Sequence, residues 1–180
     1  MREYLTLYDE KGRDTGFVQP RGDGVCAGAY YQVVSILTRD EAGHFLTTRR
    51  SAQKLSFPRC WEFTGGCVQA GEDSRRAAAR ELEEETGLVP LALEHLGSFT
   101  MPTLTGGAFF WVQVYGARVK GLAPALRMQE GEVEDYRWLW PRQIQELFRS
   151  GPTGPLNPLV WSYYQQNQAG QAGKGGNDHE

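Results

Sequence analysis

The chain has 180 residues, of which 40% are hydrophobic and 23% charged, and its net charge at pH 7 is −3. These values are ordinary for one soluble globular domain, and the slightly acidic balance argues against a general nucleic-acid-binding surface, which is normally basic. No apolar run approaches the ~20 residues of a membrane span, and the three cysteines form no short CxxC pair, which indicates reduced thiols in a cytoplasmic protein.

The first predicted elements are strands. Residues 4–8 and 15–18 are rich in aromatic and β-branched side chains and flank a turn at residues 9–12, so they predict a β-hairpin. Residues 29–38 form a strongly apolar, β-branched run that is typical of a buried central strand. After another turn, a second strand is predicted at residues 44–49.

A helix is predicted at residues 73–86. The segment is rich in alanine and in long charged side chains, which favour helix. Asp73 or Ser74 can cap its start, and Gly87 can end it in a left-handed turn. Its apolar positions lie on one arc, which we expect to face a core.

Three carboxylates lie on a neighbouring arc of this helix. Glu81, Glu84 and Glu85 are spaced i, i+3 and i+4, and each like-charged neighbour costs an isolated helix a few tenths of a kcal/mol. Water and salt can compensate for this repulsion on an exposed face. A hard cation such as Mg²⁺ or Mn²⁺ compensates better because it prefers carboxylate oxygens, and a cation that bridged the helix to a diphosphate would polarise the phosphorus.

The remaining sequence predicts further strands and helices of the same domain. The polar, glycine-bearing connection at residues 101–107 is expected to border a pocket, and Trp61 and Phe63 are expected in the core. A tail of glycine, glutamine, alanine and charged residues is expected to be disordered from residue 168 to 180. The predicted strands are 89–100, 108–119 and 132–139, and the predicted helices are 141–148 and a last one from 157 or 158 to 165.

The stretch from Gly66 to Leu88 resembles the Nudix box, G-x5-E-x7-R-E-U-x-E-E-x-G-U with U aliphatic, and matches it at every position. Seven fixed positions, each with roughly 5–10% usage, coincide by chance on the order of once in a hundred million start points. The resemblance implies an α/β Nudix fold, with a mixed sheet between helices, in a single domain over residues 1–167. Residues 3–21 resemble an N-terminal extension found in Nudix proteins close to isopentenyl diphosphate isomerase.

The resemblance also implies roles for residues of the box. Glu81, Glu84 and Glu85 would bind Mg²⁺, or Mn²⁺ in its place, together with the backbone carbonyl of Gly66. One of these glutamates or a later one would orient or deprotonate a water molecule. The first glutamate of the box, Glu72, would pair with Arg80, and this ion pair would orient the loop on the helix rather than take part in the chemistry.

Residues outside the box complete the predicted site. Arg50, Lys54 and Arg21 are candidates for binding substrate phosphates, and an ordinary surface position is the alternative for both arginines. Glu132 directly precedes the apolar Val133, matching the order of a late carboxylate that acts as metal ligand or general base in many Nudix hydrolases. The competitor for this role is the glutamate two residues earlier, and the glutamate two residues later is expected to be solvated.

The favoured function is Mg²⁺-dependent hydrolysis of a diphosphate linkage in a small molecule, and the resemblance implies a derivative of a nucleoside diphosphate as the substrate. One alternative is isopentenyl diphosphate isomerase, whose catalytic cysteine aligns with Gly66 when the chains are aligned on Trp61. Cys67 comes one residue later, and one residue reverses the side that a strand residue faces, so we expect Cys67 to pack in the protein. The other alternative is a non-catalytic ligand-sensing module, which would be expected to lose glutamates of the box.

Overall fold

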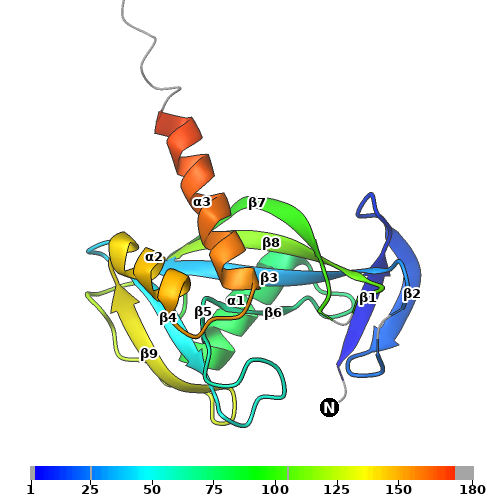
Figure 1. The fold of residues 1–180 in the computed structure, drawn as a ribbon, viewed down its shortest axis with the longest axis horizontal. Coiled ribbons are helices and arrows are strands. Elements are labelled where there is room, and N and C mark those ends of the chain that lie inside the picture. Colours follow the sequence, from blue (N-terminus) through cyan, green and yellow to red (C-terminus); the bar gives the residue numbers. More distant parts are fainter. Residues whose placement is uncertain (1–2, 25, 105, 173–180) are drawn as a thin grey trace, which may run out of the picture.

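The structure is a computed structural model that describes residues 3–24, 26–104 and 106–172. Figure 1 shows a sheet with helices on both sides. In chain order the elements are β1 (Tyr4–Tyr8), β2 (Asp14–Pro20), β3 (Tyr30–Arg39), β4 (Phe45–Arg50), β5 (Trp61–Glu62), β6 (Thr64–Cys67), α1 (Ser74–Thr86), β7 (Ala92–Pro102), β8 (Phe109–Arg118), β9 (Val133–Leu139), α2 (Pro141–Ser150) and α3 (Leu156–Ala172).

Strand β3 lies at the centre of the mixed sheet. It pairs in parallel with β8 along its whole length, from Tyr30↔Phe109 to Arg39↔Arg118, and antiparallel with β1, β4 and β6. Residues from Val33 to Thr38 are all buried, as expected for an apolar, β-branched strand that is covered on both faces. The antiparallel pairs β7–β8, β4–β9, β4–β5 and β1–β2 complete the sheet in the described part of the chain.

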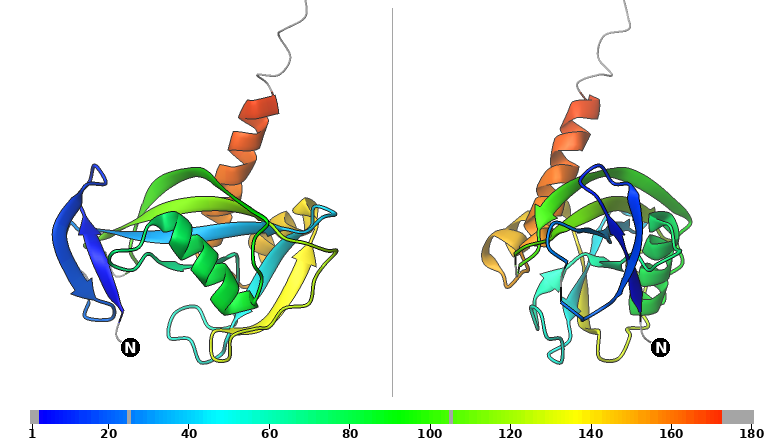
Figure 2. Two further views of the ribbon diagram at one scale, coloured as in Figure 1. Left: turned by 180° about the vertical axis from the view of Figure 1, so that it is seen from behind. Right: turned by 90° about the vertical axis from the view of Figure 1, so that its right-hand side faces the viewer.

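Helices cover the two faces of this sheet, which confirms the predicted α/β/α arrangement. The view from behind shows α1 in front of β3 and β8, with α2 and α3 on the far side (Figure 2). Alternate residues of β3 explain this division, because Val34 and Ile36 pack with buried residues of α1, whereas Val33 and Leu37 pack with α2 and α3. Two separate core clusters therefore sandwich the sheet.

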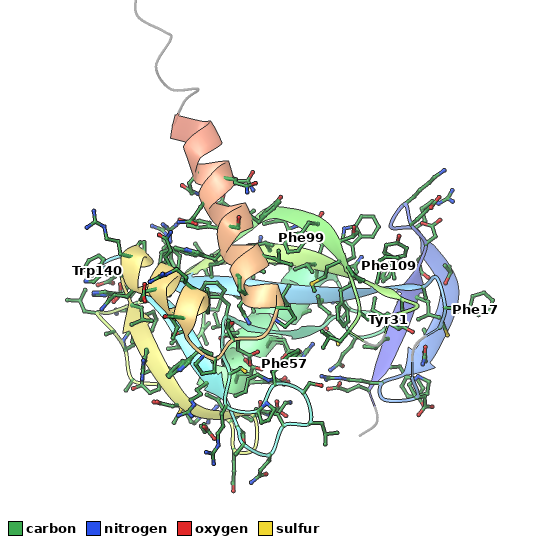
Figure 3. The ribbon with its side chains drawn as sticks, viewed as in Figure 1. Phe17, Tyr31, Phe57, Phe99, Phe109 and Trp140 are labelled. Carbon is green, nitrogen blue, oxygen red and sulfur yellow. The ribbon has the colours of Figure 1, made fainter. Side chains whose placement is uncertain are left out.

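The N-terminal hairpin β1–β2 forms as predicted, at the end of the sheet opposite to α2 and β9 (Figure 1). A small apolar cluster of Leu5, Tyr31 and Ala108 joins it to the domain. Phe17 on β2 points away from the protein and is 71% exposed (Figure 3). Just after β2, the Arg21 backbone N–H donates to the carbonyl of the residue before β1, so the hairpin sets the position of the Arg21 side chain.

Some boundaries differ from the sequence expectations. Strand β7 continues to Pro102, so it takes in the first residues of the predicted 101–107 connection. Helix α3 continues to Ala172, past the expected end at residue 165, and includes residues 168–172 of the expected tail. Residues 173–180 lie outside the described residues, where the disordered tail stays a prediction. None of the helices described is long and apolar enough to span a membrane.

Candidate active site

Helix α1 presents the three glutamates predicted from the sequence. The Asp73 side chain caps its first turn, and Gly87 ends it with a φ of 72°, in the left-handed region. Ala78 and Leu82 are fully buried against the sheet. Because burying a leucine side chain contributes about 1.5–3 kcal/mol, this apolar face fixes the rotation of the helix and directs the glutamates toward β6.

Glycines of β6 allow this close approach. A Cβ atom at Gly66 would overlap the carboxylate of Glu81, and a Cβ atom at Gly65 would overlap the backbone carbonyl of Val34. A side chain at Gly65 would therefore displace the neighbouring strand, whereas a side chain at Gly66 would push the Glu81 carboxylate aside. Gly65 and Gly66 therefore have a steric role. The backbone of Gly66 faces the glutamates of α1.

Arg80 connects the box loop, the helix and the sheet. Its Nε and Nη2 donate to the two carboxylate oxygens of Glu72 at 2.9 and 3.0 Å, so the predicted ion pair is present and bidentate. Its Nη1 donates to Glu81 at 2.8 Å and Glu84 at 3.1 Å, and Nη2 also donates to the Cys67 carbonyl at 3.2 Å. One guanidinium thus holds three carboxylates whose charges would otherwise repel one another.

Glu85 is the buried member of the set. Its residue is 7% exposed, and its Oε2 atom has no hydrogen-bond partner within the part of the chain that the structure describes. Burial raises the pKa of Glu85 well above its ordinary value, and the nearby carboxylates of Glu62, Glu81 and Glu132 raise it further. A buried carboxylate without a partner is costly, so this oxygen marks a position that a positive ligand would stabilise.

These side chains meet in one cavity with a volume of about 110 Å³, which we call the carboxylate cavity. It brings together every site residue predicted from the sequence except Glu72, which lies behind it on Arg80. The lining residues are Glu3, Arg21, Arg50, Lys54, Gly65, Gly66, Arg80, Glu81, Glu84, Glu85, Gln129 and Glu132. Segments from the N-terminal hairpin, the end of β4, α1 and the loop before β9 therefore converge here.

The loop before β9 brings Glu132 to this cavity. The Gln129 backbone N–H donates to the Glu85 carbonyl at 3.2 Å, and the Arg127 N–H donates to the Thr86 carbonyl at 2.9 Å. The loop thus satisfies carbonyl groups at the C-terminal end of α1, which have no partner inside the helix. Glu132 follows within the same loop and lines the carboxylate cavity together with the metal-binding candidates.

Each cationic side chain predicted to bind phosphate has a carboxylate partner. Lys54 and Arg21 line the cavity, as does Arg50 at the end of β4. Their positive charges offset the acidic residues of the cavity, so an anionic substrate can approach a set of glutamates. The pairs are Arg21–Glu3 at 2.5 Å, Arg50–Glu62 at 2.9 Å and Lys54–Glu132 in direct contact.

Sequence reasoning missed Glu62. It lies between Trp61 and Phe63, which the structure confirms as core residues at 4% and 3% exposure. Burial raises the pKa of Glu62 to about 7, although the charges of Arg50 and Lys54 lower it. The sequence did contain a signal for Glu62, because a charged residue stands there between two aromatic residues expected in the core, just before the glycines of β6.

The two other late glutamates differ in position. Glu130 is exposed and does not line the carboxylate cavity. Glu134 is exposed, as expected for a solvated residue, and its side chain also accepts a hydrogen bond from the Ala52 N–H at 2.9 Å and pairs with Arg49 at 3.2 Å. Strand pairing between β4 and β9 explains this contact, since it places Glu134 beside the end of β4.

An apolar pocket with a volume of about 250 Å³ adjoins the carboxylate cavity. The two share Arg21, Arg50 and the glycine pair of β6. Met101 and Leu104 line this pocket, so the predicted border at residues 101–107 is confirmed for those two positions. Phe57 forms another wall beside the start of α3 (Figure 3). The remaining apolar lining residues are Val33, Val34, Phe63, Phe110, Pro155 and Leu156.

The NUDIX domain family model matches residues 29–157. The chain belongs to the Nudix family of hydrolases. An uncharacterized Nudix hydrolase of Pseudomonas aeruginosa is 34% identical over 151 residues, which make up 83% of this chain and 86% of the relative. A crystal structure of a Deinococcus radiodurans protein is 25% identical with a TM-score of 0.72 and covers 90% of this chain and 99% of its own. An isopentenyl-diphosphate Δ-isomerase of Streptomyces griseus is 34% identical over 95 residues, 52% of this chain and 48% of the isomerase.

Membership of the Nudix family implies a divalent metal ion, and the donor chemistry of the cavity fits one. Carboxylate oxygens are the ligands that Mg²⁺ and Mn²⁺ prefer, and the buried Oε2 of Glu85 has no partner among the described residues. No three potential metal-ligating side chains of the described residues stand close enough to hold an ion as they are. Arg80 holds Glu81 and Glu84 in this arrangement, so binding a cation requires those carboxylates to turn away from Arg80.

Cys67 follows the glycine pair on β6. Cys67 pairs with Val33 across the sheet and packs with the apolar residues on the α2 and α3 face, whereas Gly66 faces Glu81 on the α1 face. Burial raises the pKa of the Cys67 thiol, which keeps it protonated. Cys67 lines neither the carboxylate cavity nor the apolar pocket, although charges of the cavity residues Arg21, Glu81 and Arg80 act on its thiol.

Proposed function

We propose that this protein hydrolyses a diphosphate linkage in a nucleoside diphosphate derivative and requires Mg²⁺, with Mn²⁺ as a substitute. The observation that carries the proposal is the unpartnered, buried carboxylate oxygen of Glu85 in a cavity that also contains Glu81, Glu84 and Glu132. Five glutamates and four cationic side chains line this cavity of about 110 Å³, so negative charge remains to be neutralised, and the cations can also contact an anionic substrate.

The residues of the cavity divide the work. Glu81, Glu84 and Glu85, with the Gly66 carbonyl, would hold the metal ion, which when bound polarises the phosphorus. Arg50, Lys54 and Arg21 bind the non-bridging phosphate oxygens and hold the diphosphate in place. Glu132 first separates from Lys54, which then binds the phosphate. Glu132 orients a water molecule toward one phosphorus and accepts its proton.

Glu72 and Arg80 act by orientation. Their bidentate ion pair ties the loop of the box to α1, and the bond from Arg80 to the Cys67 carbonyl ties both to β6. The loop of the box, α1 and β6 are therefore held together before substrate arrives, which lowers the cost of organising the site. Neither residue needs to touch the reacting atoms.

The apolar pocket supports a substrate with an uncharged organic group on its diphosphate. Because Arg21 and Arg50 line both spaces, a diphosphate bound by these arginines carries its organic group to the mouth of the pocket. Phe57 and Phe110 provide aromatic walls against which a planar base can pack. A nucleobase combines such a planar apolar face with the size that a compact pocket of this kind accepts.

A panel of diphosphate compounds tests the proposal. The purified protein is incubated with nucleoside di- and triphosphates, nucleotide sugars, dinucleoside polyphosphates and isoprenoid diphosphates, with Mg²⁺ or with excess chelator, and the products are separated and identified. We expect cleavage between two phosphorus atoms that stops in chelator. Full turnover in chelator, or no cleavage of any compound with a diphosphate, would contradict the proposal.

A further inference from the structure

The pair of Glu62 and Arg50 lies where the apolar pocket meets the carboxylate cavity. Arg50 lines both spaces, whereas Glu62 lines only the pocket. We propose that Glu62 is a positioning residue for the diphosphate: it holds one nitrogen of the Arg50 guanidinium so that the other faces the phosphate. This inference rests on the proposed hydrolysis and adds a residue that the family motif does not contain.

The contacts of Arg50 leave one donor free. Its Nη1 donates to both carboxylate oxygens of Glu62, at 2.9 and 3.0 Å, and its Nε donates to the Ser56 carbonyl at 3.0 Å. Its Nη2 atom makes no hydrogen bond to any residue that the structure describes. Because a guanidinium is planar and rigid, fixing Nε and Nη1 also fixes the direction of Nη2.

A free arginine at this place would have other carboxylates to bind. Glu85, Glu132 and Glu81 line the same cavity as Arg50, and the charge of Arg50 already lowers the pKa of Glu85 against the larger effect of burial. An arginine that turned toward Glu85 would occupy the oxygen proposed for the metal ion. Glu62 prevents this by holding Arg50 from the opposite side.

Stability alone does not account for Glu62. The side chains of Glu62 and Arg50 are 18% and 19% exposed, so both charges are largely removed from water. Ion pairs in such surroundings contribute little net stability, because desolvation consumes most of the attraction, and an apolar pair of similar volume is often as stable. The raised pKa of Glu62 reflects this desolvation. Its presence among core aromatic residues is therefore better explained by the arginine that it orients.

A double-mutant cycle tests the inference. We expect Glu62→Ala and Arg50→Ala each to lower kcat/KM for the cleaved diphosphate by roughly 10–100-fold, the scale for losing a hydrogen bond to a charged group. The loss should lie mainly in KM, since Arg50 binds phosphate before and during the reaction. The double variant should be no worse than Arg50→Ala alone, because without the arginine Glu62 has nothing to position. If the loss of kcat/KM in the double variant equals the product of the two single losses, the inference is overturned.

Chemical rescue is a second measurement, and a purely structural role of Glu62 would not affect its result. Free guanidinium at millimolar concentration, far below denaturing levels, should restore part of the activity of Arg50→Ala. The same addition should restore much less in the Arg50→Ala/Glu62→Ala double variant, because no carboxylate remains to hold the guanidinium. Equal rescue of both variants would show that Glu62 does not position the cation.

Glu134→Ala is the matched control. Glu134 pairs with Arg49, the neighbour of Arg50, and holds the Ala52 N–H at the start of the same loop, but it does not line the carboxylate cavity. We expect its kcat/KM to stay within about threefold of the unchanged protein, as for a surface pair. A loss equal to that of Glu62→Ala would assign both effects to order in the loop and overturn the inference.

Binding of inorganic pyrophosphate with Mg²⁺, measured by calorimetry, separates this inference from the proposed function. If the protein binds pyrophosphate but cleaves no diphosphate compound, the proposed function fails. A double-mutant cycle on pyrophosphate affinity then still decides the role of Glu62. If the double variant loses pyrophosphate affinity by the product of the two single losses, the inference about Glu62 is overturned and the proposed function is not affected. Absence of binding as well as of cleavage overturns both.

Discussion

The two sides of the carboxylate cavity are built differently. One side, the helical wall, consists of Arg80, Glu81, Glu84 and Glu85 on α1. The other, the loop wall, consists of Arg21, Arg50, Lys54 and Glu132, which come from segments far apart in the sequence. The helical wall has one cation for three glutamates and lacks positive charge, whereas each cation of the loop wall has its own carboxylate.

This difference indicates how each wall receives a ligand. The helical wall can accept a divalent cation because it has unneutralised negative charge, including the buried Glu85. The loop wall is neutral in pairs, so an anionic substrate must share or replace the carboxylate partners of its cations. The close Lys54–Glu132 pair is the one whose separation would free both a phosphate ligand and a base.

Breaking the helical wall should have the largest effect. We expect Glu85→Gln, or Glu84→Gln, to lower kcat by about 10³-fold or more, because loss of a metal-supported step removes several kcal/mol of transition-state stabilisation. The measurement is steady-state turnover of the cleaved diphosphate with saturating Mg²⁺, with circular dichroism to confirm the fold. Near wild-type rates in both variants would refute the assignment of these glutamates.

Breaking the loop wall at Glu132 should come next. Glu132→Gln should lower kcat by about 10²–10⁴, the usual scale for loss of a general base, and should change KM much less. Glu130→Gln is the control, since Glu130 is exposed and outside the cavity. If the Glu132 variant keeps its turnover and the Glu130 variant loses it, the role belongs to Glu130.

The pH dependence of stability sharpens the comparison. Without metal, the folded pKa of Glu62 is about 7, above its ordinary value of 4.5, and the pKa of Glu85 is also raised. Between about pH 4.5 and pH 7 the folded protein therefore binds more protons than the unfolded chain. Its free energy of unfolding falls as the pH rises through this range. The expected loss is on the order of 1–3 kcal/mol.

Melting temperatures in chelator at pH 5 and pH 7.5 measure this effect. The melting temperature should be lower at pH 7.5, the difference should shrink in Glu62→Gln, and Mg²⁺ should raise stability at pH 7.5 by binding the folded state. A melting temperature in chelator that rises steadily through this range, with no change in the variant, would show that the buried carboxylates do not govern stability there.

Cys67→Ala should have the smallest effect, because Cys67 lines neither the carboxylate cavity nor the apolar pocket. We expect diphosphate hydrolysis within about twofold of the unchanged protein and a stability loss of about 1 kcal/mol from the vacated space. Both hydrolysis and isopentenyl diphosphate isomerisation should be assayed. An isomerase activity that disappears with this change alone would support the isomerase alternative.

The sequence predicted the helical wall well because its information is local. The spacing of Glu81, Glu84 and Glu85 fixes their common arc on any helix, and Asp73 and Gly87 mark its ends. The apolar periodicity then predicts which side faces the sheet. Hence this side of the cavity was accessible without coordinates, whereas the α/β/α fold was predicted from the resemblance to the Nudix box.

The partners within the loop wall were not accessible in this way. Lys54 meets Glu132 across 78 sequence positions through the pairing of β4 with β9, which no local pattern encodes. Glu62 lies on a two-residue strand, too short to show a period of alternation, so its direction toward Arg50 could not be read. The family resemblance supplied the identities of Arg50, Lys54 and Glu132 as candidates, but not their partners.

The parallel pairing of β3 with β8 has a consequence for how the protein folds. Parallel neighbours need a long crossover, and here the segment between them contains β4, β5, β6, α1 and β7. Closing such a long loop is slow, whereas α1 has capped ends and can form early. In refolding from denaturant we therefore expect helical signal to precede the return of hydrolysis, because the loop wall can assemble only after the central strands have paired.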